Sequence, residues 1–179
     1  SIDQYFDQFD AIHPDSRLRW HGIWPGGQIE SNRLLYDYEL VYFSAGRGRV
    51  ITETATYPCQ AGTLIIIPPR LAHCTIVDFV AERWCIHFDF YGQCRAQQIL
   101  GQPYIYLDGN QTYDEQLTAA GLPPEIGVRF PLVRQLATAE MTQMAELLRL
   151  YWVHHAGDFA GVLFRRSLLL RILSLALGD

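Results

Sequence analysis

Short apolar runs broken by Gly and Pro fill residues 37–90, a pattern typical of β-strands joined by turns. In residues 36–43, alternate side chains form an apolar face, and Glu39 lies on the opposite face among further apolar residues. Residues 63–67 are continuously apolar, as expected for a strand that is covered on both faces. Residues 83–90 alternate again. Several short strands at this spacing predict a β-sandwich or a barrel.

The period changes in the last third of the chain, where apolar residues from Leu132 onward recur at helical spacing. They predict one helix with Pro131 in its first turn, followed by a second helix that Asp158 caps. The second helix, residues 159–177, is apolar on more than one stripe, so it must bury two faces. One face can pack on the chain's own core. The other needs a partner, and a second copy of the chain is the economical interpretation, with a further domain as the alternative.

The predicted dimer contact consists of leucines on this second helix: Leu163, Leu169, Leu170, Leu173 and Leu177.

Composition narrows the class of protein. At 179 residues and 49% hydrophobic content, the chain can bury a sizeable core. Its net charge of −5 provides no basic surface for gripping nucleic-acid phosphates. No uncharged apolar run is long enough to span a membrane, so no membrane partner is expected.

The cysteines, Cys59, Cys74, Cys85 and Cys94, include no Cys-x-x-Cys pair, which argues against a zinc ribbon or a thioredoxin-type motif. No signal peptide precedes them. The first interpretation is therefore reduced, partly buried thiols in a cytoplasmic protein, and a redox or metal sensor is the second.

Three residues raise the question of a cavity. Trp20 and Trp24 lie just before a Pro-Gly-Gly turn, where they either fill space in a core or offer a stacking surface to a ligand ring. Carboxylates are rarely buried without a partner, so Glu39 lies either at a sheet edge in solvent or in a polar cavity.

A resemblance to a known family rests on three segments: Tyr38-Glu39-Leu40 leading to the turn Gly46-Arg47-Gly48, Gly62 to His73 with Pro68 and Pro69 between them, and Trp84-Cys85-Ile86-His87-Phe88. In this order, and followed by two leucine-rich helices, they resemble the N-terminal sensor domain of AraC-type transcription regulators. The resemblance runs from about Trp20 to the C-terminus. It implies a mainly β fold with C-terminal helices, namely a cupin double-stranded β-helix barrel followed by an antiparallel pair of α-helices.

The resemblance also implies a division of the chain. Residues 1–19 would form an N-terminal arm, which either frays or packs over the ligand. Residues 20–127 would form the ligand-binding barrel and a connector, and residues 128–179 the two-helix dimerisation element. The chain stops where the family's helix-turn-helix units would begin, so DNA binding is expected only through a domain not present in it.

Cupins in general hold a metal through two His and a Glu of a first motif and a His of a second. Here Glu39 and His73 match the Glu and the second-motif His, whereas residues 32–35 contain no His and Arg70 replaces the usual Gly of the second motif. Two donors are too few for a transition metal. The sequence therefore predicts no metal and no cofactor.

The function implied by the resemblance is the sensing of a small effector in the barrel and its transmission through a homodimer. The candidate ligand-binding residues are Trp20, Trp24, Arg33, Glu39, Arg70 and His73. They suit a sugar, or an aromatic acid whose carboxylate pairs with an Arg. The chain is thus expected not to be an enzyme. The alternatives are a small cupin enzyme of isomerase or dioxygenase type, with Glu39 and His73 as an acid–base pair, and a purely structural dimerisation module with a filled barrel.

Overall fold

The computed structural model describes residues 12–92, 95–154 and 157–178. Its strands form two antiparallel five-stranded sheets. The first sheet has the order β1 (Asp15–Trp24), β8 (Ala81–Asp89), β3 (Tyr38–Ala45), β6 (Thr63–Ile67) and β10 (Leu132–Gln135). The second has the order β5 (Thr56–Gln60), β4 (Arg47–Thr52), β7 (His73–Val77), β2 (Ile29–Leu35) and β9 (Tyr104–Tyr106).

The connectivity of the first eight strands is that of a double-sheet jelly roll. Strands β1, β8, β3 and β6 are neighbours in one sheet, and β2, β7, β4 and β5 in the other, so the chain crosses between sheets at nearly every step. This arrangement is shared by the cupins. The predicted fold class, a cupin barrel followed by a pair of helices, is therefore confirmed.

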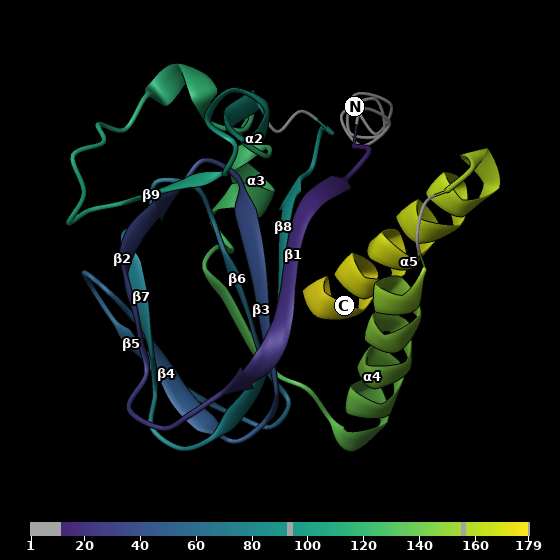
Figure 1. Cartoon of the computed structure of the whole chain (residues 1–179). Coiled ribbons are helices and arrows are strands. Elements are labelled where there is room, and N and C mark those ends of the chain that lie inside the picture. The colour runs from purple at the N-terminus through teal and green to yellow at the C-terminus, as the bar shows by residue number, and fades with distance from the viewer. Residues whose placement is uncertain (1–11, 93–94, 155–156, 179) are drawn as a thin grey trace.

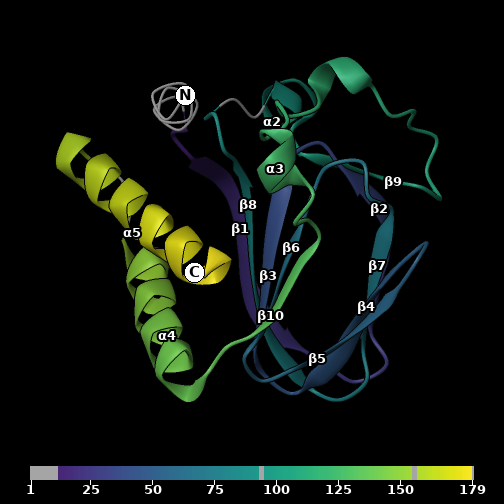
Figure 2. The same cartoon turned by 180° about the vertical axis from the view of Figure 1, so that it is seen from behind.

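Short helical segments lie between β8 and β10, namely α2 (Arg95–Leu100), η1 (Glu115–Leu117) and α3 (Pro124–Gly127). The C-terminal layer consists of α4 (Thr138–Val153) and α5 (Phe159–Leu177). Helices α4 and α5 lie together against the outer face of the first sheet, and the second sheet lies on the far side of the barrel from them (Figures 1 and 2).

Strand β3 explains how the layers are held. All of its residues from Tyr38 to Phe43 are buried, because both faces of the strand are covered. Tyr38, Leu40 and Tyr42 pack with Leu148, Ile172 and other residues of the two helices. Val41 and Phe43 pack between the two sheets instead. The alternation read from the sequence thus separates an outer core, under the helices, from an inner one.

The start of the first helix was predicted wrongly. Leu132–Gln135 forms the edge strand β10, paired with β6, and the helix begins only at Thr138. The apolar spacing of Leu132 and Leu136 is compatible with both structures, and pairing with the exposed edge of β6 decides for the strand. The second helix, α5, spans the predicted residues, and the Asp158 carboxylate accepts a hydrogen bond from the Gly161 N–H as a cap (2.7 Å).

One side chain joins three elements at the base of the helix pair. Arg134 of β10 donates from Nη1 to the Leu175 and Ala176 carbonyls (2.6 and 3.2 Å) at the end of α5. Its Nη2 donates to Glu140 (2.7 Å) in the first turn of α4. These contacts place a cation at a helix C-terminus and an anion at a helix N-terminus, as the helix dipoles favour.

The sheet extends beyond the predicted barrel segment at both ends, since β1 starts at Asp15 and β10 lies after residue 127. Of the predicted N-terminal arm, residues 1–11 lie outside the described residues. The division of the chain into arm, barrel and helical element stays a prediction. None of the described helices is long and apolar enough to cross a membrane.

Candidate functional site

A cavity of ≈ 200 Å³ lies between the two sheets of the barrel. Its walls come from β1, β2, β3, β8 and β9. The residues that line it are Leu18, Arg19, Trp20, Trp24, Glu30, Arg33, Glu39, Arg83, Cys85, His87 and Tyr104. The lining combines aromatic side chains with an unusual number of buried charges, and charges are rarely buried without a partner.

Strand register brings the first charges together. In the first sheet Glu39 lies directly opposite His87, and in the second Arg33 lies directly opposite His73. Because the two sheets face each other, the Arg33 guanidinium reaches across to Glu39, where Nη2 donates to both carboxylate oxygens (2.9 and 2.8 Å). Both side chains are almost completely buried. Burial opposes the charge on Glu39, but Arg33 and then His87 outweigh it and hold the pKa of this carboxyl well below its usual value.

The metal site that the cupin resemblance implies does not fit these residues. Arg33 lies in the segment, residues 32–35, where the resemblance would place the first-motif histidines, and its guanidinium contacts the Glu39 carboxylate and, through Nε, Nε2 of His73 (3.4 Å). The two groups that would serve as metal donors thus already face a fixed cation. Among the described residues, no group of three His, Cys, Asp or Glu side chains is arranged to hold a metal ion. We therefore assign the positive charge at this position to Arg33.

His73 is positioned by its own backbone neighbourhood. Its Nδ1 lies 2.9 Å from the Leu71 carbonyl, which can only accept a hydrogen bond. The proton therefore belongs on Nδ1, and Nε2 is left to accept from Nε of Arg33. His73 is 1% exposed. It acts as a support behind Arg33 and is not itself part of the cavity wall.

His87 lies between two carboxylates. Its Nδ1 is 3.0 Å from Oδ1 of Asp37, and its Nε2 is 3.5 Å from Oε1 of Glu39. Burial opposes a charge on the imidazole, but Asp37 and Glu39 outweigh burial and raise its pKa. Burial also raises the pKa of Asp37 to about 6, and the neighbouring His87 offsets this only in part. The row Asp37–His87–Glu39 can therefore hold and move a proton near neutral pH.

A second arginine lies at the other end of the charge cluster. Glu30 binds Nη1 of Arg33 through one oxygen (2.8 Å) and Nη2 of Arg83 through the other (3.1 Å). The result is an alternating chain of carboxylates and guanidiniums, Glu39–Arg33–Glu30–Arg83. Arg83 is fully buried. Burial also raises the pKa of the nearby Cys85 thiol to about 12, so this cysteine is protonated at neutral pH.

Aromatic rings frame these charges. Trp20 and Trp24 meet edge to face, with ring centroids 5.2 Å apart. The Arg83 guanidinium lies 4.4 Å from the Trp24 ring, and the Arg33 guanidinium 5.0 Å from the Tyr104 ring. Trp20 is 40% exposed and so forms the rim of the cavity.

The same strand that carries the tryptophans also contacts the helices. Arg19 of β1 donates from Nη1 to the Tyr151 carbonyl and from Nη2 to the Trp152 carbonyl (3.3 Å), both in the last turn of α4. Next to it, His21 stacks on Trp84 (3.5 Å), and Trp84 meets Trp152 edge to face (4.8 Å). Strand β1 therefore connects the cavity rim to the end of α4.

The predicted ligand-binding residues fall into three places. Those that line the cavity are Trp20, Trp24, Arg33 and Glu39. His73 lies behind them and contacts Arg33. Arg70 lies apart from the cavity: its side chain is 53% exposed and pairs with Glu115 on the surface (2.7 Å).

The predicted dimer leucines are also divided. Leu169 and Leu173 are buried in the chain's own core, and Leu177 is partly buried against the same core. Leu163 and Leu170 are about half exposed (52% and 49%) and remain available to a partner.

Several cavity residues were missed by the sequence reasoning: Glu30, Arg83, Cys85, His87 and Tyr104. For three of them a signal existed, because the alternation in residues 83–90 places Arg83, Cys85 and His87 on one face. Glu30 had no such signal. It is three residues before Arg33, a spacing that puts two side chains on opposite faces of a regular strand, and a register irregularity between them brings both to the cavity.

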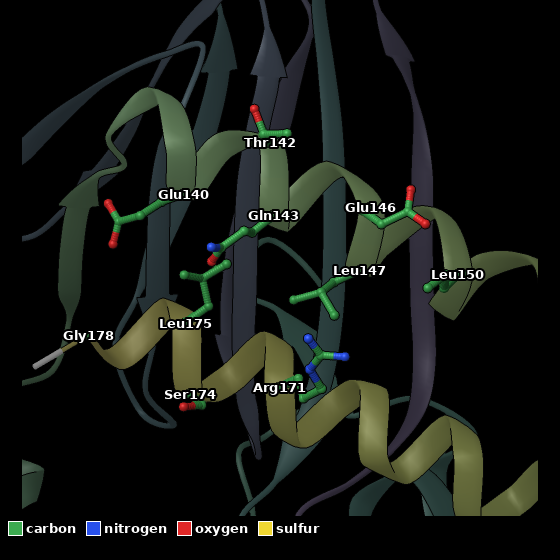
Figure 3. A pocket seen from close by; sticks show the side chains of 10 residues that line it. All are labelled: Glu140, Thr142, Gln143, Glu146, Leu147, Leu150, Arg171, Ser174, Leu175 and Gly178. Carbon is green, nitrogen blue, oxygen red and sulfur yellow. The ribbon is translucent and has the colours of Figure 1, made fainter.

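A second hollow lies outside the barrel, between α4 and α5, with a volume of ≈ 650 Å³. Figure 3 shows Arg171 of α5 extending toward Leu147 of α4 across this groove. Half of the residues that line it are exposed polar residues, and none of the buried charges lies in it. The three described cysteines, Cys59, Cys74 and Cys85, form no disulfide, and Cys94 lies outside the described residues.

Comparison with known proteins yields structural matches only. No protein-family model matches the chain, and no match was found among curated proteins. Among solved structures, an oxalate decarboxylase from Bacillus subtilis matches with a TM-score of 0.41 and 16% identity over 55% of this chain and 25% of that one. A salicylate 1,2-dioxygenase from Pseudaminobacter salicylatoxidans matches with a TM-score of 0.37 and 12% identity over 38% of this chain and 20% of that one. A conserved Streptococcus pyogenes protein of unknown function matches with a TM-score of 0.37 and 13% identity over 41% and 66%.

These matches correct one prediction. The chain was expected not to be an enzyme, and two of the proteins whose fold it resembles are enzymes, so that expectation is overturned. The chain spans a quarter or less of the length of these two enzymes. At such identities the likeness concerns the fold alone and assigns neither a reaction nor a ligand to this chain.

Proposed function

We propose that this chain is the effector-binding and dimerisation part of an AraC-type transcription regulator, which senses a small molecule in the barrel cavity. One observation carries the proposal: the strand that forms the cavity rim is bonded to the helix pair. Trp20 lies at the rim, and the adjacent Arg19 donates to two carbonyls in the last turn of α4. An effector that moves Trp20 moves Arg19 as well.

The coupling has a simple energetic requirement. An effector shifts the position of α4 only by as much as it binds one arrangement of β1 better than the other. The contacts at stake are those of Arg19 with Tyr151 and Trp152, together with the packing of Trp84 on Trp152. They form a small, discrete set that two arrangements of β1 can make or break.

The proposed homodimer uses the outer side of the helix pair. Phe159, Leu163 and Leu170 fall on one stripe of α5 and are 78%, 52% and 49% exposed. Val153, in the last turn of α4, is also exposed (59%). Exposed apolar residues in such a stripe are typical of a surface that a partner covers, and a closed two-fold dimer covers it symmetrically.

Two measurements test the proposal. Sedimentation velocity on this chain is expected to show a dimer, and a Leu163→Glu/Leu170→Glu variant is expected to be a monomer with unchanged circular dichroism. A thermal-shift panel of sugars and ring carboxylates is expected to include a ligand that raises Tm, because binding stabilises the folded state. A wild-type monomer would contradict the dimer, and no response across the panel would contradict the sensor.

A second candidate function, a cupin enzyme using acid–base catalysis, is favoured by the row Asp37–His87–Glu39. His87 faces the cavity with a carboxylate on either side, and its raised pKa suits it to donate or accept a proton. Incubation of the purified chain with any ligand that raises its Tm, followed by mass spectrometry, separates the two functions. Turnover that is lost in His87→Gln would establish the enzyme, and unchanged ligand would favour the sensor.

A further inference from the structure

Arg83 lines the cavity, and most of its hydrogen-bonding capacity is unused among the residues that the structure describes. Its side chain is 0% exposed. Only Nη2 has a partner: it donates to Glu30 (3.1 Å) and lies 3.8 Å from Sγ of Cys85. Nε and Nη1 are buried, and neither has a hydrogen-bond partner among the described residues. Buried guanidinium nitrogens are normally paired, so this exception calls for an explanation.

Contacts with its neighbours hold the Arg83 side chain in place. The residue lies on β8, and its guanidinium is held 4.4 Å from the Trp24 ring and 5.7 Å from the Phe43 ring. Glu30 fixes the third nitrogen. The side chain is thus anchored from several sides in the wall of the cavity and has little freedom to turn toward another partner.

The cavity offers few free acceptors to balance these free donors. Both oxygens of Glu39 accept from Arg33, and the two oxygens of Glu30 are divided between Arg33 and Arg83. Glu30 is therefore one carboxylate shared between two guanidiniums. A ligand that complements this cavity brings acceptors, and an anionic acceptor makes the strongest hydrogen bonds to a guanidinium.

We propose that the cavity binds a small carboxylate with a single flat ring, whose carboxylate is held by Nε or Nη1 of Arg83 and whose ring lies against Trp24 and Tyr104. This inference rests on the proposed function, because it names the class of effector for the same cavity. A sugar fits less well, since each of its hydroxyls brings a donor that needs an acceptor. The volume agrees: ≈ 200 Å³ suits one ring with a small substituent, as a cavity of about 150 Å³ can hold benzene.

The test compares matched pairs of ligands by isothermal titration calorimetry on the whole chain. Benzoate and phenylacetate are each titrated beside their neutral amides, which keep the shape and remove the charge. At least one carboxylate is expected to bind at least tenfold more tightly than its amide. Equal affinity for acid and amide would overturn the inference.

Two variants assign the binding to Arg83. In Arg83→Met, Glu30 keeps Arg33 as a partner, so no charge is orphaned and the protein is expected to fold with unchanged circular dichroism. Its carboxylate affinity is expected to fall at least tenfold. The matched control is Arg47→Met, which removes a guanidinium stacked on Phe79 (4.3 Å) outside the cavity and is expected to leave affinity unchanged. If Arg83→Met fails to fold, Arg83→Lys takes its place, because it keeps the charge and loses the planar donors.

The outcomes separate this inference from the function on which it rests. Retained carboxylate affinity in the Arg83 variant would overturn the inference, as would binding of sugars without binding of any carboxylate, while both leave the sensor intact. No binding of either class would overturn both. Conversion of a bound carboxylate to a product would overturn the regulator and leave the anion site in place.

Discussion

The two faces of strand β8 are stabilised by different interactions. Toward the helices it presents Trp84, Ile86 and Phe88, whose burial among other apolar side chains stabilises the fold through area removed from water. Toward the cavity it presents Arg83 and His87, whose burial is tolerated because each has a charged partner. A strand can thus serve a core on one side and a receptor wall on the other. The first side depends on shape and the second on pairing.

The largest effect is expected from breaking an ion pair in the cavity wall. In Arg33→Met, Glu39 is left as a buried carboxylate without its guanidinium, and the free energy of unfolding is expected to fall by about 3–5 kcal/mol in urea denaturation. The double variant Arg33→Met/Glu39→Met removes both charges and is expected to recover most of this loss. Equal stability of the single and double variants would show that the wall does not depend on pairing.

A comparable but slightly smaller effect is expected on the apolar side. Ile172 of α5 is 0% exposed and packs in the outer core. Ile172→Ala is expected to cost about 2–5 kcal/mol, with no partner substitution able to restore it. The control is Ile99→Ala, at a 62% exposed position, where a change within about 0.5 kcal/mol is expected. A loss at Ile172 no larger than the control's would place the helices off the sheet.

The charged groups of the cavity wall also predict that stability depends on pH, whereas the apolar core under the helices has no such dependence. The pKa of Asp37 is raised to about 6 and that of His87 is raised above its ordinary value. Between the unfolded and folded pKa of each group, the folded state binds more protons, so stability falls as pH rises. We expect the free energy of unfolding to decrease from about pH 4 to pH 6 as Asp37 loses its proton, and to decrease further above about pH 6.5, the ordinary pKa of an imidazole, as His87 loses its proton.

Asp37→Asn is the check on this assignment. It removes one titrating group and the main carboxylate partner of His87, so the decline above pH 6 is expected to flatten. Glu39 acts in the opposite direction, because its pKa is depressed and its contribution disappears only in strong acid. Stability that rises with pH above about pH 6.5, or an unchanged slope in the variant, would contradict the Asp37–His87 pairing.

The smallest effect concerns a single hydrogen bond at the start of α5. Asp158→Ala removes the cap of the Gly161 N–H and is expected to cost about 0.5–2 kcal/mol in thermal or urea unfolding. Asp158→Ser keeps a capping oxygen and is expected to restore most of it. If both variants equal the wild type, the α5 start is stabilised by packing alone.

The sequence predicted what local periodicity controls. Residues 63–67 and 159–177 are a strand and a helix as expected. Glu39 lies in the cavity wall, one of the two positions that the alternation left open. The prediction failed where a free sheet edge or a strand irregularity determines the structure. Leu132–Gln135 became a strand because β6 had a free edge.

The candidate site shows the same limit. Arg70 resembled a motif position, but it lies at a turn with positive φ (68°) and pairs with Glu115 from a distant segment. Arg83, which directly precedes the segment of residues 84–88, was visible only as the first member of an alternating row. The position of Glu30 in the cavity depends on a register irregularity of β2, which no residue type in this segment predicts. Pairing between distant segments determines where buried charges are stable, and local sequence patterns do not predict it.

Arg134 has a mechanical consequence for the helix pair. Its hydrogen bonds fasten the start of α4 and the end of α5 to the edge strand β10, while Arg19 and Asp15 of β1 contact the last turn of α4 and Arg166 in the middle of α5. A rotation about the Arg134 end leaves its three bonds in place, whereas a slide along the sheet breaks all of them. A movement of the helix pair that keeps these three bonds is therefore a rotation about β10, in which the displacement grows with distance from Arg134.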